Sequence, residues 1–139
     1  MRMLVPCKLS IVSTVDGKET VFSRDGEGEF SFLRTSLFYR DEGAEVCVET
    51  SENEVVISRR GDYTMELFLR EGKKTKGTLG ILGQSGEVEV YTEKLGHTLT
   101  DNSFMLIANY HLCFGADTQK MKIRMTARLS DKNKDRGRL

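Results

Sequence analysis

Apolar and polar residues alternate along most of this chain, and turn-forming residues interrupt the alternation at short, regular intervals. A period of two places successive side chains on opposite faces of a β-strand. Glu87-Val88-Glu89-Val90 shows the alternation most cleanly and predicts that both glutamates face solvent. Short strands at regular spacing are typical of antiparallel sandwiches and barrels. The pattern therefore predicts an all-β domain with little helix.

Glycine-containing dipeptides end many of these runs and predict tight hairpins between consecutive strands. At Asp16-Gly17 both residues tolerate the positive φ that a two-residue turn requires. Gly61-Asp62 and Glu52-Asn53 separate later runs in the same way. Gly26 and Gly28 lie inside a run and predict a bulge or bend. The expected strands are built around residues 7–11, 19–32, 37–39, 46–48, 55–57, 65–69, 75–82, 87–90, 104–114 and 121–129.

The last of these segments admits two interpretations. Met121, Met125 and Leu129 are four residues apart, as on one face of a helix, whereas Ile123 and Ala127 fit only a strand. We interpret the segment as a strand. A chain of 139 residues has the length of one domain. We therefore expect a single barrel domain over residues 1–130, followed by a charged tail, residues 131–139, whose composition predicts disorder.

Charge and cysteine content indicate the compartment and exclude two classes of partner. The 21 basic residues are balanced by 21 acidic ones, so the basic excess that non-specific binding to nucleic acid or a membrane surface requires is absent. The opening segment, residues 1–6, is too short for a signal-peptide core. Cys7, Cys47 and Cys113 are odd in number and lie among apolar or β-branched neighbours, which predicts reduced, buried thiols. We expect a cytoplasmic protein.

Residue types that carry catalysis or bind metals occur here without the required spacing. His97 and His111 have no Cys, His or carboxylate at metal-ligand spacing. Cys113 shares a strand face with His111 at ~6.6 Å, too far for an activating hydrogen bond. The glycines at every third position over residues 77–86 lack the phosphate-loop pattern and predict a bent strand pair. We expect no cofactor, no metal and no enzymatic activity.

The segment 104–114 has two apolar faces. One face carries only apolar or aromatic residues, from Phe104 to Phe114, and the other begins with Met105 and Ile107. Such a strand is either covered on both sides or lies at a subunit contact. Two interpretations of the second apolar face therefore stay open: it packs against further core residues, or it forms the contact surface of a homodimer.

Several short motifs, taken in order, resemble the YwiB-like family of bacterial proteins of unknown function. The resemblance spans roughly residues 7–129 and rests on Gly28-Glu29-Phe30, Tyr39-Arg40-Asp41, residues 57–61, Met65, Phe68, residues 72–75 with Gly77, Thr92, Tyr110 and Leu112. It implies a calycin-like, lipocalin-type antiparallel β-barrel, for which we expect eight to ten strands. It implies no activity.

Four polar residues at positions that match the family pattern are the candidate ligand-binding site: Tyr39, Asp41, Arg59 and Tyr110. A barrel of this size is filled by side chains or holds one small ligand. Asp41 and Arg59 should pair if they point inward, because a lone buried charge is costly, and Arg59 could instead hold an anionic head group. We expect a non-enzymatic binding module for a small apolar or amphipathic ligand. The alternatives are that these residues only tie the barrel together, and that the protein is a homo-oligomeric interaction module.

Overall fold

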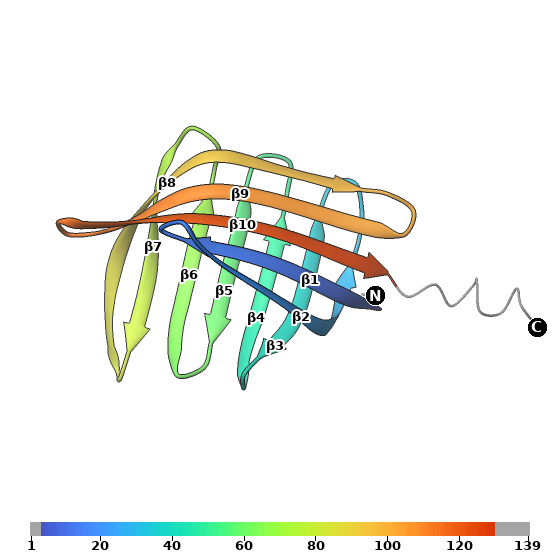
Figure 1. Cartoon of the computed structure of the whole chain (residues 1–139), viewed down its shortest axis with the longest axis horizontal. Helices are drawn as coiled ribbons and strands as arrows, with labels where there is room; N and C mark the ends of the chain where they lie inside the picture. Colours follow the sequence, from blue (N-terminus) through green and yellow to red (C-terminus); the bar gives the residue numbers. More distant parts are fainter. Residues whose placement is uncertain (1–3, 130–139) are drawn as a thin grey trace, which may run out of the picture.

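In the computed structural model, which describes residues 4–129, the chain forms a closed barrel of ten antiparallel strands (Figure 1). The strands are β1 (Val5–Val15), β2 (Lys18–Glu29), β3 (Thr35–Asp41), β4 (Ala44–Thr50), β5 (Val55–Arg60), β6 (Tyr63–Leu69), β7 (Lys74–Ile81), β8 (Gln84–Leu99), β9 (Ser103–Phe114) and β10 (Asp117–Leu129). Each strand pairs with the next, and β10 pairs with β1 to close the ring. The predicted all-β antiparallel barrel is confirmed. In this part of the chain no helix is long and apolar enough to cross a membrane.

Two groups of strands cross each other around the core. In Figure 1, β3–β7 run upright, and β9, β10 and β1 lie across them. β8 belongs to both groups, because it starts beside β7 and then bends over to run beside β9. A β-bulge between Thr92 and Lys94 shifts the register with β9, and such an extra residue bends the strand that contains it. The bend lets one continuous meander enclose one core.

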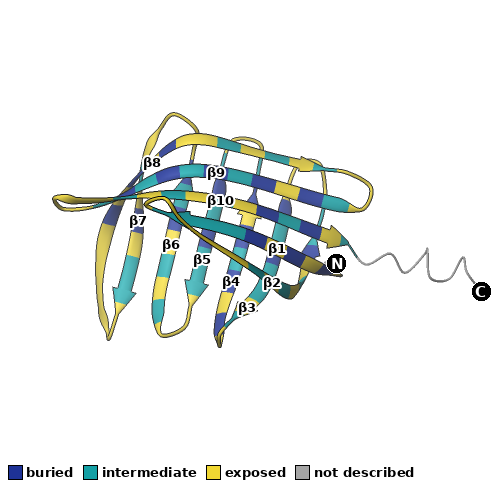
Figure 2. Ribbon diagram, in the orientation of Figure 1, coloured by how far each residue is buried: buried dark blue, intermediate teal, exposed yellow. Residues whose placement is uncertain are grey.

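Buried residues alternate with more exposed ones along many of the strands (Figure 2). In β4 the buried residues alternate with exposed Glu45 and Glu49. Glu87 and Glu89 are exposed, as the sequence predicts. The buried core contains Cys7, Leu9, Ile11, Leu37, Val46, Val48, Val55, Ile57, Leu67, Leu69, Val88, Val90, Phe104, Leu106, Ala108, Tyr110, Leu112, Met125 and Ala127.

The two ends of the barrel differ. Two-residue connections, among them the predicted Asp16-Gly17 turn with φ values of 49° and 86°, lie at one end, which we call the turn end. Longer connections form the opposite, loop end. There, Nε2 of His97 lies 2.9 Å from the carbonyl oxygen of Ser51, and the ring centroids of Phe30 and Phe104 are 6.2 Å apart. The ring of His97 also lies 6.1 Å from that of Phe104, so these side chains pack together at the loop end.

Two local predictions are changed by the structure, and one interpretation is confirmed. The second strand ends at Glu29, and Phe32 is 87% exposed in the loop that follows. Cys7 is buried, but Cys47 and Cys113 are half-buried on the outer face, because their strand neighbours take the inward positions. The final segment is a strand, which confirms our interpretation over the helical alternative. The tail for which disorder is predicted lies outside the described residues.

Close packing between β6 and β7 depends on a residue without a side chain at position 77. A Cβ at Gly77 would lie 2.6 Å from the carbonyl oxygen of Glu66 and 2.9 Å from Cδ2 of Leu67. We expect Gly77→Ala to lower the free energy of unfolding by about 1–3 kcal/mol in urea denaturation, as overpacking does. Gly86→Ala is the matched control, because nothing lies within 4 Å of its Cβ position. Equal losses in the two variants would contradict this packing.

Candidate functional site

The four predicted site residues line one cavity inside the barrel. Tyr39 and Asp41 lie at the end of β3, Arg59 lies near the end of β5, and Tyr110 lies in β9. The alternation along each strand puts all four side chains on the inner face. They surround a cavity of about 160 Å³ near the turn end. The structure thus brings together residues from strands that are far apart in the meander.

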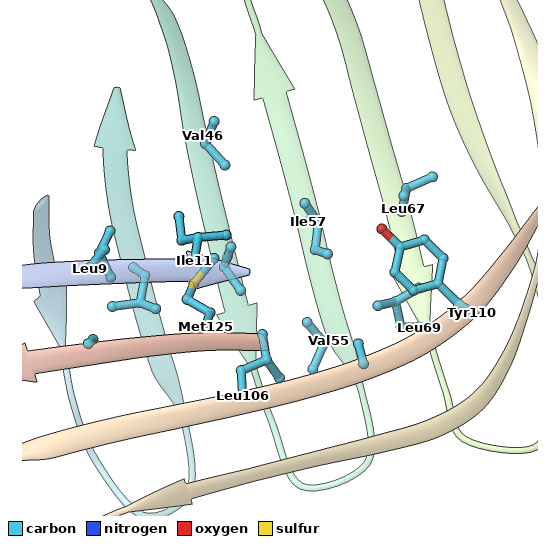
Figure 3. Packing of buried hydrophobic residues seen from close by; sticks show 14 of the residues in the cluster. Leu9, Ile11, Val46, Val55, Ile57, Leu67, Leu69, Leu106, Tyr110 and Met125 are labelled. Atoms are coloured by element: carbon cyan, nitrogen blue, oxygen red, sulfur yellow. The ribbon is translucent and has the colours of Figure 1, made fainter. Parts of the chain in front are cut away.

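The rest of the cavity wall is mostly apolar. Figure 3 shows Val46 from β4, Ile57 from β5, and Leu106 and Tyr110 from β9, with the Tyr110 ring standing off β9 into the barrel. The full apolar lining consists of Ile11, Phe22, Val46, Val48, Ile57, Met65, Leu106, Met121, Ile123 and Met125. An apolar protein cavity of ~150 Å³ holds one benzene molecule. A guest with a body of that size therefore fits here.

The Asp41 carboxylate joins two guanidinium groups beside this cavity. Nη2 of Arg24 donates to Oδ1 of Asp41 at 2.7 Å, and Nη1 of Arg59 donates to Oδ2 at 3.4 Å. Nη2 of Arg59 also donates to Oδ1 of Asp62 at 3.0 Å. The side chains of Arg24, Asp41 and Arg59 are mostly buried, whereas that of Asp62 is 80% exposed. The pairing predicted for Asp41 and Arg59 is present, and Arg24 adds a second cation.

Aromatic rings support both guanidinium groups. The guanidinium carbon of Arg24 lies 4.7 Å from the centroid of the Phe22 ring, and that of Arg59 lies 4.4 Å from the centroid of the Tyr63 ring. Both distances suit cation–π contacts. Phe22, Arg24 and Tyr63 are site residues that the sequence analysis missed. For Arg24 a signal existed, because it lies two positions after Phe22 and two before Gly26 and so shares their inward face.

Hydrogen-bond donors predominate around the cavity. Nε of Arg59 is buried and has no hydrogen-bond partner among residues 4–129. Burial raises the pKa of Tyr39 to about 12, and the nearby Asp41 carboxylate adds to the shift. Burial also raises the pKa of Tyr110, with Tyr39 and Tyr63 adding to it. Both hydroxyl groups therefore keep their protons at neutral pH and can donate to an acceptor.

The two histidines lie away from the cavity. His111 points outward from β9 and contacts the carboxylate of Glu93, the extra residue in the β8 bulge. This hydrogen bond lowers the pKa of Glu93. His97 packs at the loop end. No group of three or more His, Cys, Asp or Glu side chains within the described residues is arranged to hold a metal ion.

Larger hollows lie on the outside of the barrel. One of about 630 Å³ is at the loop end, and one of about 780 Å³ covers the outer face of β2–β6. Charged side chains line much of both, including Arg70, Glu71 and Lys73 in the first. Asp25 and Glu27 contribute to the second. Because ligand sites usually combine an apolar wall with a few polar groups, the interior cavity is the better candidate.

The outer face of β9 is partly covered. Met105 is 42% exposed, whereas Ile107, Asn109, His111 and Cys113 are half-buried. The second apolar face predicted for this segment is therefore open at its start. A homodimer contact through it stays a prediction.

Replacing Asp41 removes the carboxylate that two guanidinium groups share. We expect Asp41→Asn to lower the free energy of unfolding by about 2–4 kcal/mol, because partly buried cations lose their counter-charge. Asp25→Asn is the matched control, since Asp25 pairs with Lys8 in solvent and such pairs contribute about 0–1 kcal/mol. Urea denaturation of both variants measures the difference. A similar small effect in both would show that the cluster is not a stabilising element.

The buried tyrosine at the cavity predicts a loss of stability in alkaline solution. The pKa of the Tyr39 hydroxyl is 10.0 in the unfolded chain, and burial raises it to about 12 in the barrel. Below pH 10 the hydroxyl is neutral in both the folded and the unfolded chain, so its full contribution to the free energy of unfolding is present. As the pH rises through the folded pKa, the unfolded chain is favoured by ionisation and stability is lost. We expect the urea midpoint of the wild type to fall between pH 10 and about 12, and to fall less in Tyr39→Phe. An identical pH dependence of the two proteins would contradict the burial of this hydroxyl.

Comparison with known proteins agrees with this architecture. The crystal structure of the ywiB protein from Bacillus subtilis matches with a TM-score of 0.79 and 20% sequence identity, over 92% of this chain and 94% of that one, which shows a shared fold. No curated protein matches the chain. A family model described as a domain of unknown function, DUF1934, matches residues 8–127. The predicted resemblance is thereby confirmed, and the chain belongs to the DUF1934 family.

Proposed function

We propose that this barrel is a non-enzymatic binding module that holds one small amphipathic molecule in its interior cavity. One observation carries the proposal: the 160 Å³ cavity combines an apolar wall with a cluster of charged and phenolic groups on one side. Small-molecule sites are typically apolar with a few placed polar groups that orient the ligand. The apolar body of a guest would pack against the methionines, and its polar end would reach Arg59.

The architecture supports the same proposal. Closed up-and-down barrels, including lipocalins, enclose a ligand between their inward side chains. The meander of β1–β10, closed by the pairing of β10 with β1, has this connectivity. We therefore propose that the barrel is calycin-like. We also propose a cytoplasmic location, which the three cysteine thiols support.

The groups that face the cavity favour binding over catalysis. General acid–base catalysis works best when the pKa of the catalytic group lies near the working pH. Tyr39 and Tyr110 have pKa values raised well above neutrality. The Asp41 carboxylate is held by Arg24 and Arg59. The two tyrosine hydroxyls therefore orient a guest and do not exchange protons readily with it at neutral pH.

Self-association is a second candidate function, supported by a different surface. Val12 and Val21 are aligned across β1 and β2 on the outer face, and Val21 is 62% exposed. Arg124 aligns with Val12 and Ile107 in the same outer row. Sedimentation velocity at increasing concentration distinguishes a self-associating barrel from a monomer.

Native mass spectrometry of the protein purified from its own host tests the binding proposal. We expect wild type to retain one small molecule per chain, and Val46→Phe to lose it because the larger side chain fills the cavity that Val46 lines. Val56→Phe is the matched control, because Val56 lies on the outer face of β5, and it should keep the molecule. Circular dichroism confirms that both variants fold. Wild-type protein that carries only the mass of the chain would contradict the proposal.

A further inference from the structure

We infer that the guest is a small monoanion whose carboxylate-like head group faces Arg59 and whose apolar body is about as large as a benzene ring. This inference rests on the binding function proposed above and specifies the chemical class of its ligand. Three properties of the cavity lead to it: its charge, its hydrogen-bonding groups and its size.

The partly buried cluster carries an excess of one positive charge. Arg24 and Arg59 contribute two cations, and Asp41 contributes one anion. Asp62 also contacts Arg59, but its side chain is 80% exposed, so water screens its charge. A buried charge without a partner is unfavourable. A monoanionic guest would bring the cluster to neutrality, whereas a neutral or cationic guest would leave or increase the excess.

The hydrogen-bonding groups favour an acceptor. The two oxygens of Asp41 already accept three hydrogen bonds from Arg24 and Arg59. Nε of Arg59 has no partner within the described residues, and Tyr39 and Tyr110 keep their hydroxyl protons. A carboxylate only accepts hydrogen bonds, and its bonds to a guanidinium group are charge-assisted and strong. A donor-rich head group would instead compete with the arginines for Asp41.

The size of the cavity limits the apolar body. Its volume is about 160 Å³, close to the ~150 Å³ that holds benzene and below the ~300 Å³ where sites for drug-sized ligands begin. Leu106 and Ile57 are buried in its wall, whereas Met65 and Met121 are half-buried and lie toward the turn end. The structure therefore assigns a compact ring or a short chain to the apolar part.

Three isosteric probes of different charge test this inference: benzoate, benzamide and benzamidine. The protein carries ¹³C-methyl methionine, and the NMR signals of Met65, Met121 and Met125 report on the cavity that they line. Met105 points outward from β9 and serves as an internal control. We expect benzoate to shift the three cavity signals but not that of Met105. Benzamide should bind at least about tenfold more weakly, because it loses the charge-assisted bond, and benzamidine should not bind.

Two neighbouring arginines provide a matched pair of variants. Arg59→Gln should weaken benzoate binding by at least about tenfold, for the same reason. Arg60→Gln should bind benzoate like wild type, because Arg60 is exposed on the outer face. If Arg59→Gln does not fold, the order of the three probes on wild type decides the question.

The outcomes separate this inference from the proposed function. If the three probes bind equally well and Val46→Phe abolishes all binding, the cavity is a binding site but the anionic class is wrong. If no probe binds while native mass spectrometry still finds a molecule that Val46→Phe loses, the inference fails alone. If no probe binds and no molecule is retained, both fail. Unchanged benzoate affinity in a folded Arg59→Gln variant would also overturn the inference.

Discussion

The carboxylate of Asp41 is the counter-charge that allows two arginine side chains to lie inside a largely apolar barrel. Arg24 comes from β2 and Arg59 from β5, and Asp41 on β3 contacts both. Without this anion, each guanidinium group would have to move toward water, because an unpaired cation in a low-dielectric interior is costly. The polar side of the cavity therefore depends on one residue at the end of one strand.

The position of the cavity follows from how the two ends of the barrel are filled. At the loop end, the rings of Phe30 and His97 lie 6.2 Å and 6.1 Å from the ring of Phe104, centroid to centroid, and pack against it. At the turn end, the inward positions carry arginines, tyrosines and methionines, whose long side chains meet around a space and do not close it. The same alternation that builds the core thus also places polar groups beside the apolar wall.

Much of this arrangement could be predicted from the alternation of side chains between the two faces of a strand. Tyr39 and Asp41 are two positions apart on one strand, so one inward side chain implies the other. The turn signals separate the chain into the ten observed strands, although most strands extend beyond the ranges predicted for them. Closure of the ring could not be predicted this way, because pairing between β1 and β10 joins the two ends of the described chain. In the first part of β8, Val88 and Val90 point inward. The bulge shifts this alternation by one residue, so Leu95 and His97 point inward in the second part. Uninterrupted alternation would instead place Lys94 and Gly96 on the inner face.

The site could be predicted only in part for a related reason. The contact between Arg24 and Asp41 links residues on neighbouring strands that share few aligned pairs. Sequence alternation assigns a face to each residue, but it does not tell which long side chains on that face reach each other. Phe22 and Tyr63 were missed because their role, stacking under a guanidinium group, depends on this reach.

A high-resolution crystal structure of the protein grown with saturating benzoate tests the central claim most directly. We expect electron density for one planar molecule inside the barrel, with its ring against the cavity methionines and its carboxylate in contact with the guanidinium group of Arg59. An interior in which side chains fill the cavity, with benzoate absent or bound only on the outer surface, would contradict the claim that the barrel encloses a binding site.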